Sequence, residues 1–115
     1  MIARSVELFA AAVFAAVPAS ALSGATHFML VNGTDSLMGS VSIRHFRTGA
    51  WQALTVSPGP GGRISVSFKD EDCAFDIRAN LASKDPVIWS GVNVCEAKAV
   101  ILHRDGSGAA WVDYE

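Results

Sequence analysis

The chain has 115 residues and a formal net charge of −2, and half of its residues are hydrophobic. This charge balance argues against nucleic-acid binding, because nucleic-acid ligands select clustered Lys and Arg and a basic pI. The length favours a single domain.

Residues 1–21 have the layout of a cleavable secretory signal peptide. Arg4 supplies a positive start, the uncharged run LFAAAVFAAV follows, and small residues precede a cleavage site after Ala21. The run is much shorter than the roughly 20 residues that a membrane-spanning helix needs. We therefore expect a periplasmic or secreted protein, whose mature chain is a single β domain over 22–115 without a transmembrane span.

The rest of the chain shows no helical periodicity. Short runs of β-branched and aromatic residues recur instead, and Gly, Pro, Asn or Asp separate them. We expect strands over residues 27–31, 40–47, 51–56, 63–69, 73–81, 87–95, 98–103 and 109–114. Seven or eight short strands of this kind predict an all-β fold, a small antiparallel β-sandwich or barrel.

Alternation over 73–81 predicts which side chains of that strand face solvent. One face is apolar, and the other carries Ala74, Asp76, Arg78 and Asn80. Asp76 and Arg78 could form a surface ion pair there, or instead make a polar patch for a partner together with neighbouring strands. A tryptophan usually packs in the core, but an exposed one marks a binding face. Asp76, Arg78, Asn80 and the nearby Trp89 make up the predicted binding surface.

Cys73 and Cys95 are the two cysteines of the chain. In an exported protein two cysteines most often pair with each other. A redox pair would favour closer spacing, and a metal site would need more ligands nearby. We expect a structural disulfide that joins two neighbouring strands.

Three histidines, His27, His45 and His103, are spread over separate predicted strands, which favours ordinary surface positions over a metal site. The acidic run 70–72 has no glycine and no calcium-loop pattern, so we expect a solvated turn. No nucleophile motif with an assignable base is present. We therefore expect no metal, no cofactor and no catalytic residues.

The sequence contains C-A-F-D-I-R at 73–78 and G-V-N-V-C at 91–95. These two motifs resemble those of a family of small exported β-domain proteins of α-proteobacteria. Some of these proteins carry the enzyme name argininosuccinate lyase, but such a lyase is a large helical tetramer, and this chain is too short and too β-rich to build one. The resemblance implies export, the disulfide and one domain, and it implies no reaction.

These observations favour an exported, non-catalytic β-sandwich that binds another periplasmic or extracellular protein. An enzyme is the less favoured class. One alternative is a small periplasmic enzyme or metal carrier that uses His27, His45 or His103 with Asp72 or Asp76. It requires at least two of these side chains to converge. Another alternative is a structural protein of the cell envelope. The oligomeric state does not follow from the sequence.

Overall fold

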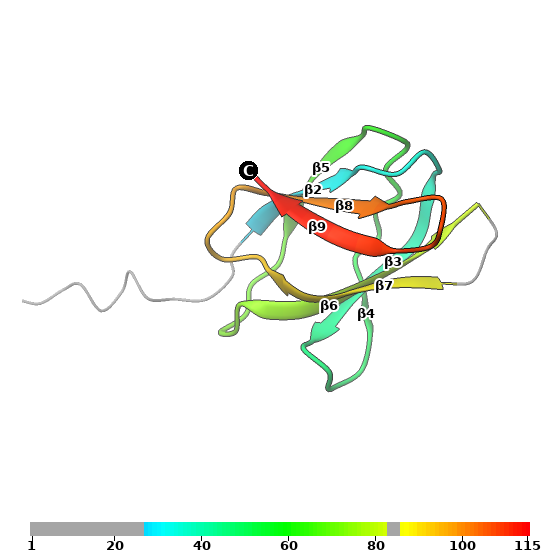
Figure 1. The fold of residues 1–115 in the computed structure, drawn as a ribbon. Coiled ribbons are helices and arrows are strands. Elements are labelled where there is room, and N and C mark those ends of the chain that lie inside the picture. Colours follow the sequence, from blue (N-terminus) through cyan, green and yellow to red (C-terminus); the bar gives the residue numbers. More distant parts are fainter. Residues whose placement is uncertain (1–26, 83–85) are drawn as a thin grey trace, which may run out of the picture.

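The computed structural model describes residues 27–82 and 86–115, which form eight strands. These are β2 (His27–Asn32), β3 (Met38–His45), β4 (Gln52–Ala53), β5 (Arg63–Ser67), β6 (Ala74–Leu81), β7 (Pro86–Asn93), β8 (Ala99–Arg104) and β9 (Ala110–Tyr114). They build two four-stranded sheets, ordered β5-β2-β8-β9 and β4-β3-β6-β7 (Figure 1). The predicted all-β fold is confirmed. No helix in the described ranges could cross a membrane, and the predicted signal segment 1–21 lies outside them.

One strand pair departs from the expected all-antiparallel arrangement. β2 and β8 run parallel, with Leu30 opposite Val100, whereas the other strand pairs are antiparallel. In Figure 1 the orange β8 lies beside the blue β2 although most of the chain separates them. Parallel neighbours need a long crossover connection. Here the chain passes through β3 and β4 of the other sheet, returns as β5, and then passes through β6 and β7 before β8, and this path supplies the crossover.

The strand predicted over 51–56 is the other difference from expectation. Only Gln52–Ala53 pairs, opposite Ser42 and Ile43 at the edge of the second sheet. Thr55 has a φ of 60°. A β-branched residue with positive φ is rare because its side chain crowds the backbone, and this conformation does not continue a strand. Leu54 and Val56 therefore lie against the core without extending the sheet.

Alternating apolar residues from both sheets fill the space between them. The buried cluster includes Phe28 of β2, Phe75 of β6 and Leu102 of β8. Trp89 of β7 is the largest fully buried side chain, and its indole Nε1 donates a hydrogen bond of 2.8 Å to the His103 carbonyl of β8. This bond joins the two sheets and satisfies the one polar group that the buried indole carries.

A fully buried Asn32 ties together the loops at one end of the sandwich. Its Nδ2 donates to the carbonyl oxygens of Ser36 (2.7 Å) and Pro58 (2.9 Å). Its Oδ1 accepts from the Thr34 amide (2.9 Å) and the Thr34 hydroxyl (2.6 Å). Both donor hydrogens and the acceptor oxygen of the Asn32 amide have partners, and these hydrogen bonds offset the free-energy cost of burying the polar groups.

The predicted disulfide is present between Cys73 and Cys95, with the two Cα atoms 5.3 Å apart. Cys73 directly precedes β6, and Cys95 follows β7, its antiparallel neighbour. The Val94 amide also donates to the Cys73 carbonyl at 3.0 Å. The bond thus closes one end of the β6–β7 pair.

Removal of the disulfide tests its contribution to stability. The Cys73→Ala, Cys95→Ala protein should unfold about 3 kcal/mol more easily, because the cross-link no longer restricts the unfolded chain over a sequence separation of 22 residues. Urea titration followed by tryptophan fluorescence measures the change. Reductant should produce a similar loss in the wild type and no further loss in the variant. Equal midpoints for oxidised and reduced wild type would contradict the prediction.

Asn32→Ala tests the buried loop network. The substitution removes four hydrogen bonds and leaves the buried Thr34 amide without an acceptor, while the Ser36 and Pro58 carbonyls each keep one other donor. We therefore expect a loss of about 1–3 kcal/mol in the free energy of unfolding. Asn80→Ala is the matched control, because Asn80 is only partly buried and should change stability by less than about 0.5 kcal/mol. Similar losses in the two variants, measured by urea unfolding, would show that the Asn32 network is not special.

Candidate functional site

Asp76 of β6 is a fully buried carboxylate, with an exposed fraction of 0%. Its Oδ2 accepts from Arg44 Nε at 3.0 Å and from the Arg47 amide at 2.9 Å. Its Oδ1 accepts from the Gly91 amide at 3.2 Å. A single side chain therefore holds the end of β3, the turn after it and the middle of β7. Asp76 is the one acidic residue in the strands of this sheet.

Two amides that donate to the Asp76 carboxylate lie at irregular positions of the backbone. Opposite Asp76 the register of β6 and β7 shifts, so that the segment between Trp89 and Val92 bulges. Gly91 lies in this bulge with a φ of 68°, a conformation that residues other than glycine rarely adopt. Arg47 has a φ of 61° in the turn after β3. That conformation is costly for a non-glycine residue, and the hydrogen bond to Asp76 offsets part of the cost.

Burial raises the pKa of the Asp76 carboxyl, because a charge is costly away from water. Hydrogen bonds from the Arg47 amide, the Arg44 guanidinium and the Gly91 amide act in the opposite direction and outweigh burial. The net pKa therefore lies below its ordinary value, and Asp76 carries its negative charge at neutral pH.

Arg44 and Arg78 both hold their guanidinium groups over the ring of Trp51. The Cζ of Arg44 lies 4.4 Å from the ring centroid, and the Cζ of Arg78 lies 4.2 Å from it. A cation over an indole face is attracted by the ring electrons, by about 0.5–1 kcal/mol at an exposed site. The Asp76 carboxylate holds the Arg44 guanidinium by a hydrogen bond. Arg44, Arg78 and Trp51 therefore form an ordered group on the outer side of the second sheet.

Apolar side chains continue the surface around this group. Phe46 is 42% exposed, with the guanidinium of Arg47 5.0 Å from its ring centroid. Ile88 of β7 is 45% exposed and lies opposite Arg78 in the register. We call the set the arginine–aromatic face; it comprises Arg44, Phe46, Arg47, Trp51, Arg78 and Ile88. Its three guanidinium groups outnumber the single Asp76 carboxylate, although the whole chain is acidic.

The predicted binding surface is thus partly corrected. The prediction that Asp76 lies on the solvent side as the surface partner of Arg78 is wrong, because loop residues cover Asp76 and Arg44 pairs with it. Trp89, 2% exposed, cannot contribute to a surface because its ring fills the core. Arg78 and Asn80 remain at the outer side, partly buried.

The histidines lie in two different sheets. His45 ends β3, and its Nε2 lies 3.0 Å from Asp70 Oδ2 and 3.5 Å from Asp72 Oδ2. His103 of β8 stacks on Trp111 and contacts Asp113 at 3.0 Å. His27 begins β2, in the same sheet as His103. The convergence of a histidine with Asp72 that the alternative hypothesis required is therefore present at His45.

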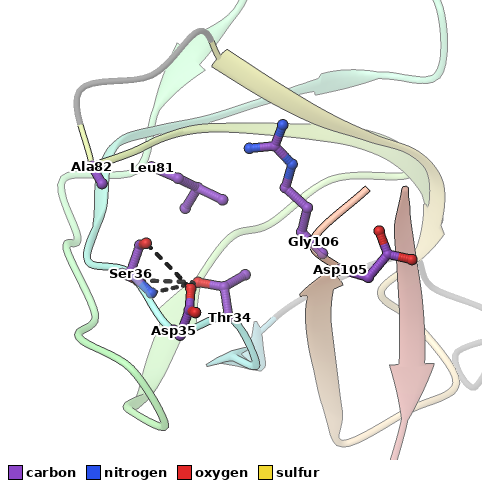
Figure 2. Close-up of a pocket in the computed structure, with 8 residues that line it drawn as sticks. Thr34, Asp35, Ser36, Leu81, Ala82, Asp105 and Gly106 are labelled. Atoms are coloured by element: carbon purple, nitrogen blue, oxygen red, sulfur yellow. Dashed lines mark hydrogen bonds between the residues drawn. The ribbon is translucent and has the colours of Figure 1, made fainter. Parts of the chain in front are cut away.

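A pocket of about 310 Å³ opens at the Asn32 end of the sandwich. Figure 2 shows Thr34, Asp35 and Ser36 grouped on one side and Asp105 with Gly106 on the other. Thr34 and Ser36 hydrogen-bond to each other and to neighbouring groups, which holds the loop. Hydrogen bonds from Ser107 and the Ala109 amide to its carboxylate lower the pKa of Asp105.

Arg104 also lines this pocket. Among the buried side-chain nitrogen and oxygen atoms of the described ranges, only its Nε lacks a hydrogen-bond partner. Asp35 and Asp105 line the same pocket, so their negative charges oppose an anionic ligand of this arginine. The pocket consequently has no clear charge preference, in contrast to the arginine–aromatic face.

Sequence reasoning missed the pairing of Arg44 with Asp76 and the position of Trp51. Alternation with buried Val41 and Ile43 puts Arg44 on the outer face of β3, but its partner depends on the register of β3 against β6, which places Arg44 directly opposite Asp76. The missed signal is chemical: β6 has one acidic residue, and the neighbouring strand β3 and the turn after it carry Arg44 and Arg47. Trp51 reaches the site from a loop, where periodicity carries no information.

The comparisons with known proteins show the fold and no activity. No protein-family model matches the chain, and no curated protein matches it. A solved structure described as the NMR structure of the protein from Eubacterium rectale is similar, with a TM-score of 0.54 and 18% sequence identity. The similarity covers 77% of this chain and 86% of the other. At this identity it supports the β architecture only.

Substitution of Asp76 tests the buried anchor. We expect Asp76→Asn to lower the free energy of unfolding by about 2–4 kcal/mol at neutral pH, because it removes a charge that three donors compensate. The pKa of Asp76 is lowered by folding, so the stabilisation is complete above the unfolded pKa of about 3.9 and is lost as the pH falls through the folded pKa.

Urea unfolding at several pH values therefore measures the stability difference between wild type and Asp76→Asn and the pH dependence of that difference. The difference between wild type and Asp76→Asn should be largest near neutral pH and should narrow below about pH 4. Asp35→Asn removes an exposed carboxylate and should change stability by less than about 0.5 kcal/mol. A difference that stays constant down to strongly acidic pH would contradict the assigned role of Asp76.

Proposed function

We propose that this protein is an exported, non-catalytic domain that binds an acidic protein partner through the arginine–aromatic face. The observation that carries the proposal is the pair of guanidinium groups held over Trp51, one of them anchored by a buried carboxylate. Export is supported by the disulfide, which is typical of small domains in oxidising compartments, and by the signal-like sequence of residues 1–21.

The composition of the face matches that of protein-binding hot spots. Trp and Arg dominate such sites, where a large aromatic group fills the centre and arginine supplies both area and charge. Arg47 and Arg78 have no ion-pair partner among the described residues, so both are available to carboxylates of a partner. Exposed Phe46 and Ile88 add apolar contact area, which favours a protein over a purely ionic ligand.

The face is also pre-organised. Arg44 is held by Asp76, and Arg47 is part of a turn whose amide binds the same carboxylate. Side chains that are ordered before binding lose less conformational entropy when the complex forms. The opposite sheet offers a contrast: exposed Trp111 stacks on His103, and the charge beside this pair is the carboxylate of Asp113. The preference for an acidic partner is therefore specific to one side of the molecule.

Affinity capture from periplasmic or extracellular extract tests the proposal. Immobilised wild-type protein should retain a protein that Arg78→Glu and Trp51→Ala fail to retain, whereas Trp111→Ala on the other sheet should retain it. With the isolated partner, Arg78→Glu should weaken binding at least about tenfold, and added salt should slow association.

Circular dichroism and urea unfolding establish that each variant is folded before capture. Retention of the same proteins by wild type, Arg78→Glu and Trp51→Ala would overturn the proposal. Loss of retention in Trp111→Ala alone would move the binding site to the other sheet.

A further inference from the structure

Three potential metal ligands meet at the end of the second sheet, outside the arginine–aromatic face. His45 is the last residue of β3, and Asp70 and Asp72 lie between β5 and β6. The imidazole Nε2 lies 3.0 Å from Asp70 Oδ2 and 3.5 Å from Asp72 Oδ2. One ligand atom from each residue lies within 4.8 Å of both others.

These separations suit a common coordination sphere. Zn²⁺ binds imidazole nitrogen and carboxylate oxygen at about 2.0–2.2 Å, so two of its ligands in a tetrahedral site are separated by about 3.3–3.6 Å. The observed contacts need only small side-chain movements to reach that geometry. A neutral imidazole and two carboxylates would supply two negative charges to a divalent cation, and three protein ligands would leave a further position for water.

Neighbouring groups already hold the side chains of Asp70 and His45 and the backbone of Asp72. Asp70 Oδ1 accepts from the Asp72 amide at 2.9 Å, which fixes the two aspartates relative to each other. The His45 ring stacks on buried Phe75, with the ring centroids 5.4 Å apart. Cys73, directly after Asp72, is anchored by the disulfide. A pre-formed site of this kind loses little entropy when it binds an ion.

We propose that His45, Asp70 and Asp72 form a binding site for a divalent transition-metal ion of the Zn²⁺ type. Imidazole favours transition metals, whereas Ca²⁺ requires six to eight oxygen ligands, which this cluster does not supply. The proposal is independent of the arginine–aromatic face, because none of its three residues belongs to that face.

The protein contains its own comparison for this site. His103 contacts Asp113 at the same distance of 3.0 Å, but no second carboxylate joins that pair in the described ranges. If a histidine–aspartate contact were enough to bind a metal, both places would bind one. If two carboxylates are needed, only the His45 site would do so.

Titration of the purified protein with Zn²⁺ tests the proposal, by calorimetry and by NMR of the histidine side chains. We expect one saturable site whose first effect is on the His45 imidazole. His45→Ala and Asp72→Asn should each weaken Zn²⁺ binding at least about tenfold. Removal of a residue that only supports a metal ligand already weakens binding by about 10–100-fold, so loss of a ligand itself should cost no less. His103→Ala should bind as wild type does.

Asp72→Asn guards against a folding artefact, because the Asp72 side chain is 65% exposed and its amide form fits the same turn. Ca²⁺ should neither bind the site nor compete with Zn²⁺. The proposal is overturned if wild type shows no saturable binding, if His45→Ala leaves the affinity unchanged, or if His103 responds before His45.

Discussion

The buried carboxylate of Asp76 is the interaction on which the second sheet depends. A charge removed from water is costly, and it persists here because two backbone amides and a guanidinium group surround it. The donors come from three different segments, β3, the turn after it and the bulge of β7. Each segment contains or borders an irregular feature that would be unfavourable alone. Asp76 therefore holds local backbone conformations that the strand pattern does not favour.

The same interaction connects stability to the candidate binding face. Arg44 is long and flexible, and an exposed arginine loses considerable conformational entropy when it is held in one position. Because Asp76 already holds its Nε, the guanidinium can lie over Trp51 without further ordering on binding. Arg78 approaches the same ring from β6. Thus one buried acidic residue orders a basic, aromatic surface in a chain that is acidic overall.

The other stabilising bonds join separate elements of the fold and lie outside the arginine–aromatic face. The disulfide closes the β6–β7 pair, Trp89 bonds across to β8, and Asn32 joins loops at the end of the sandwich. A small domain buries a limited share of its surface, so specific polar and covalent ties matter more than in a large core. His45, Asp70 and Asp72 lie beside the disulfide, in a part of the molecule that these ties keep ordered.

The sequence by itself determined the all-β class, most strand positions and the disulfide. Alternating apolar residues and frequent turn residues are local signals, and two cysteines have one possible intramolecular pairing. What the tertiary structure decided were the parallel β2–β8 pair, the burial of Asp76 and Trp89, and the two groups of side chains at Trp51 and His45. These depend on strand register and on loops that fold back over a sheet. Alternation assigned Asp76 to the outer side of β6, but it carries no information about the turn that covers this residue, and so only the folded chain shows that the carboxylate is an anchor.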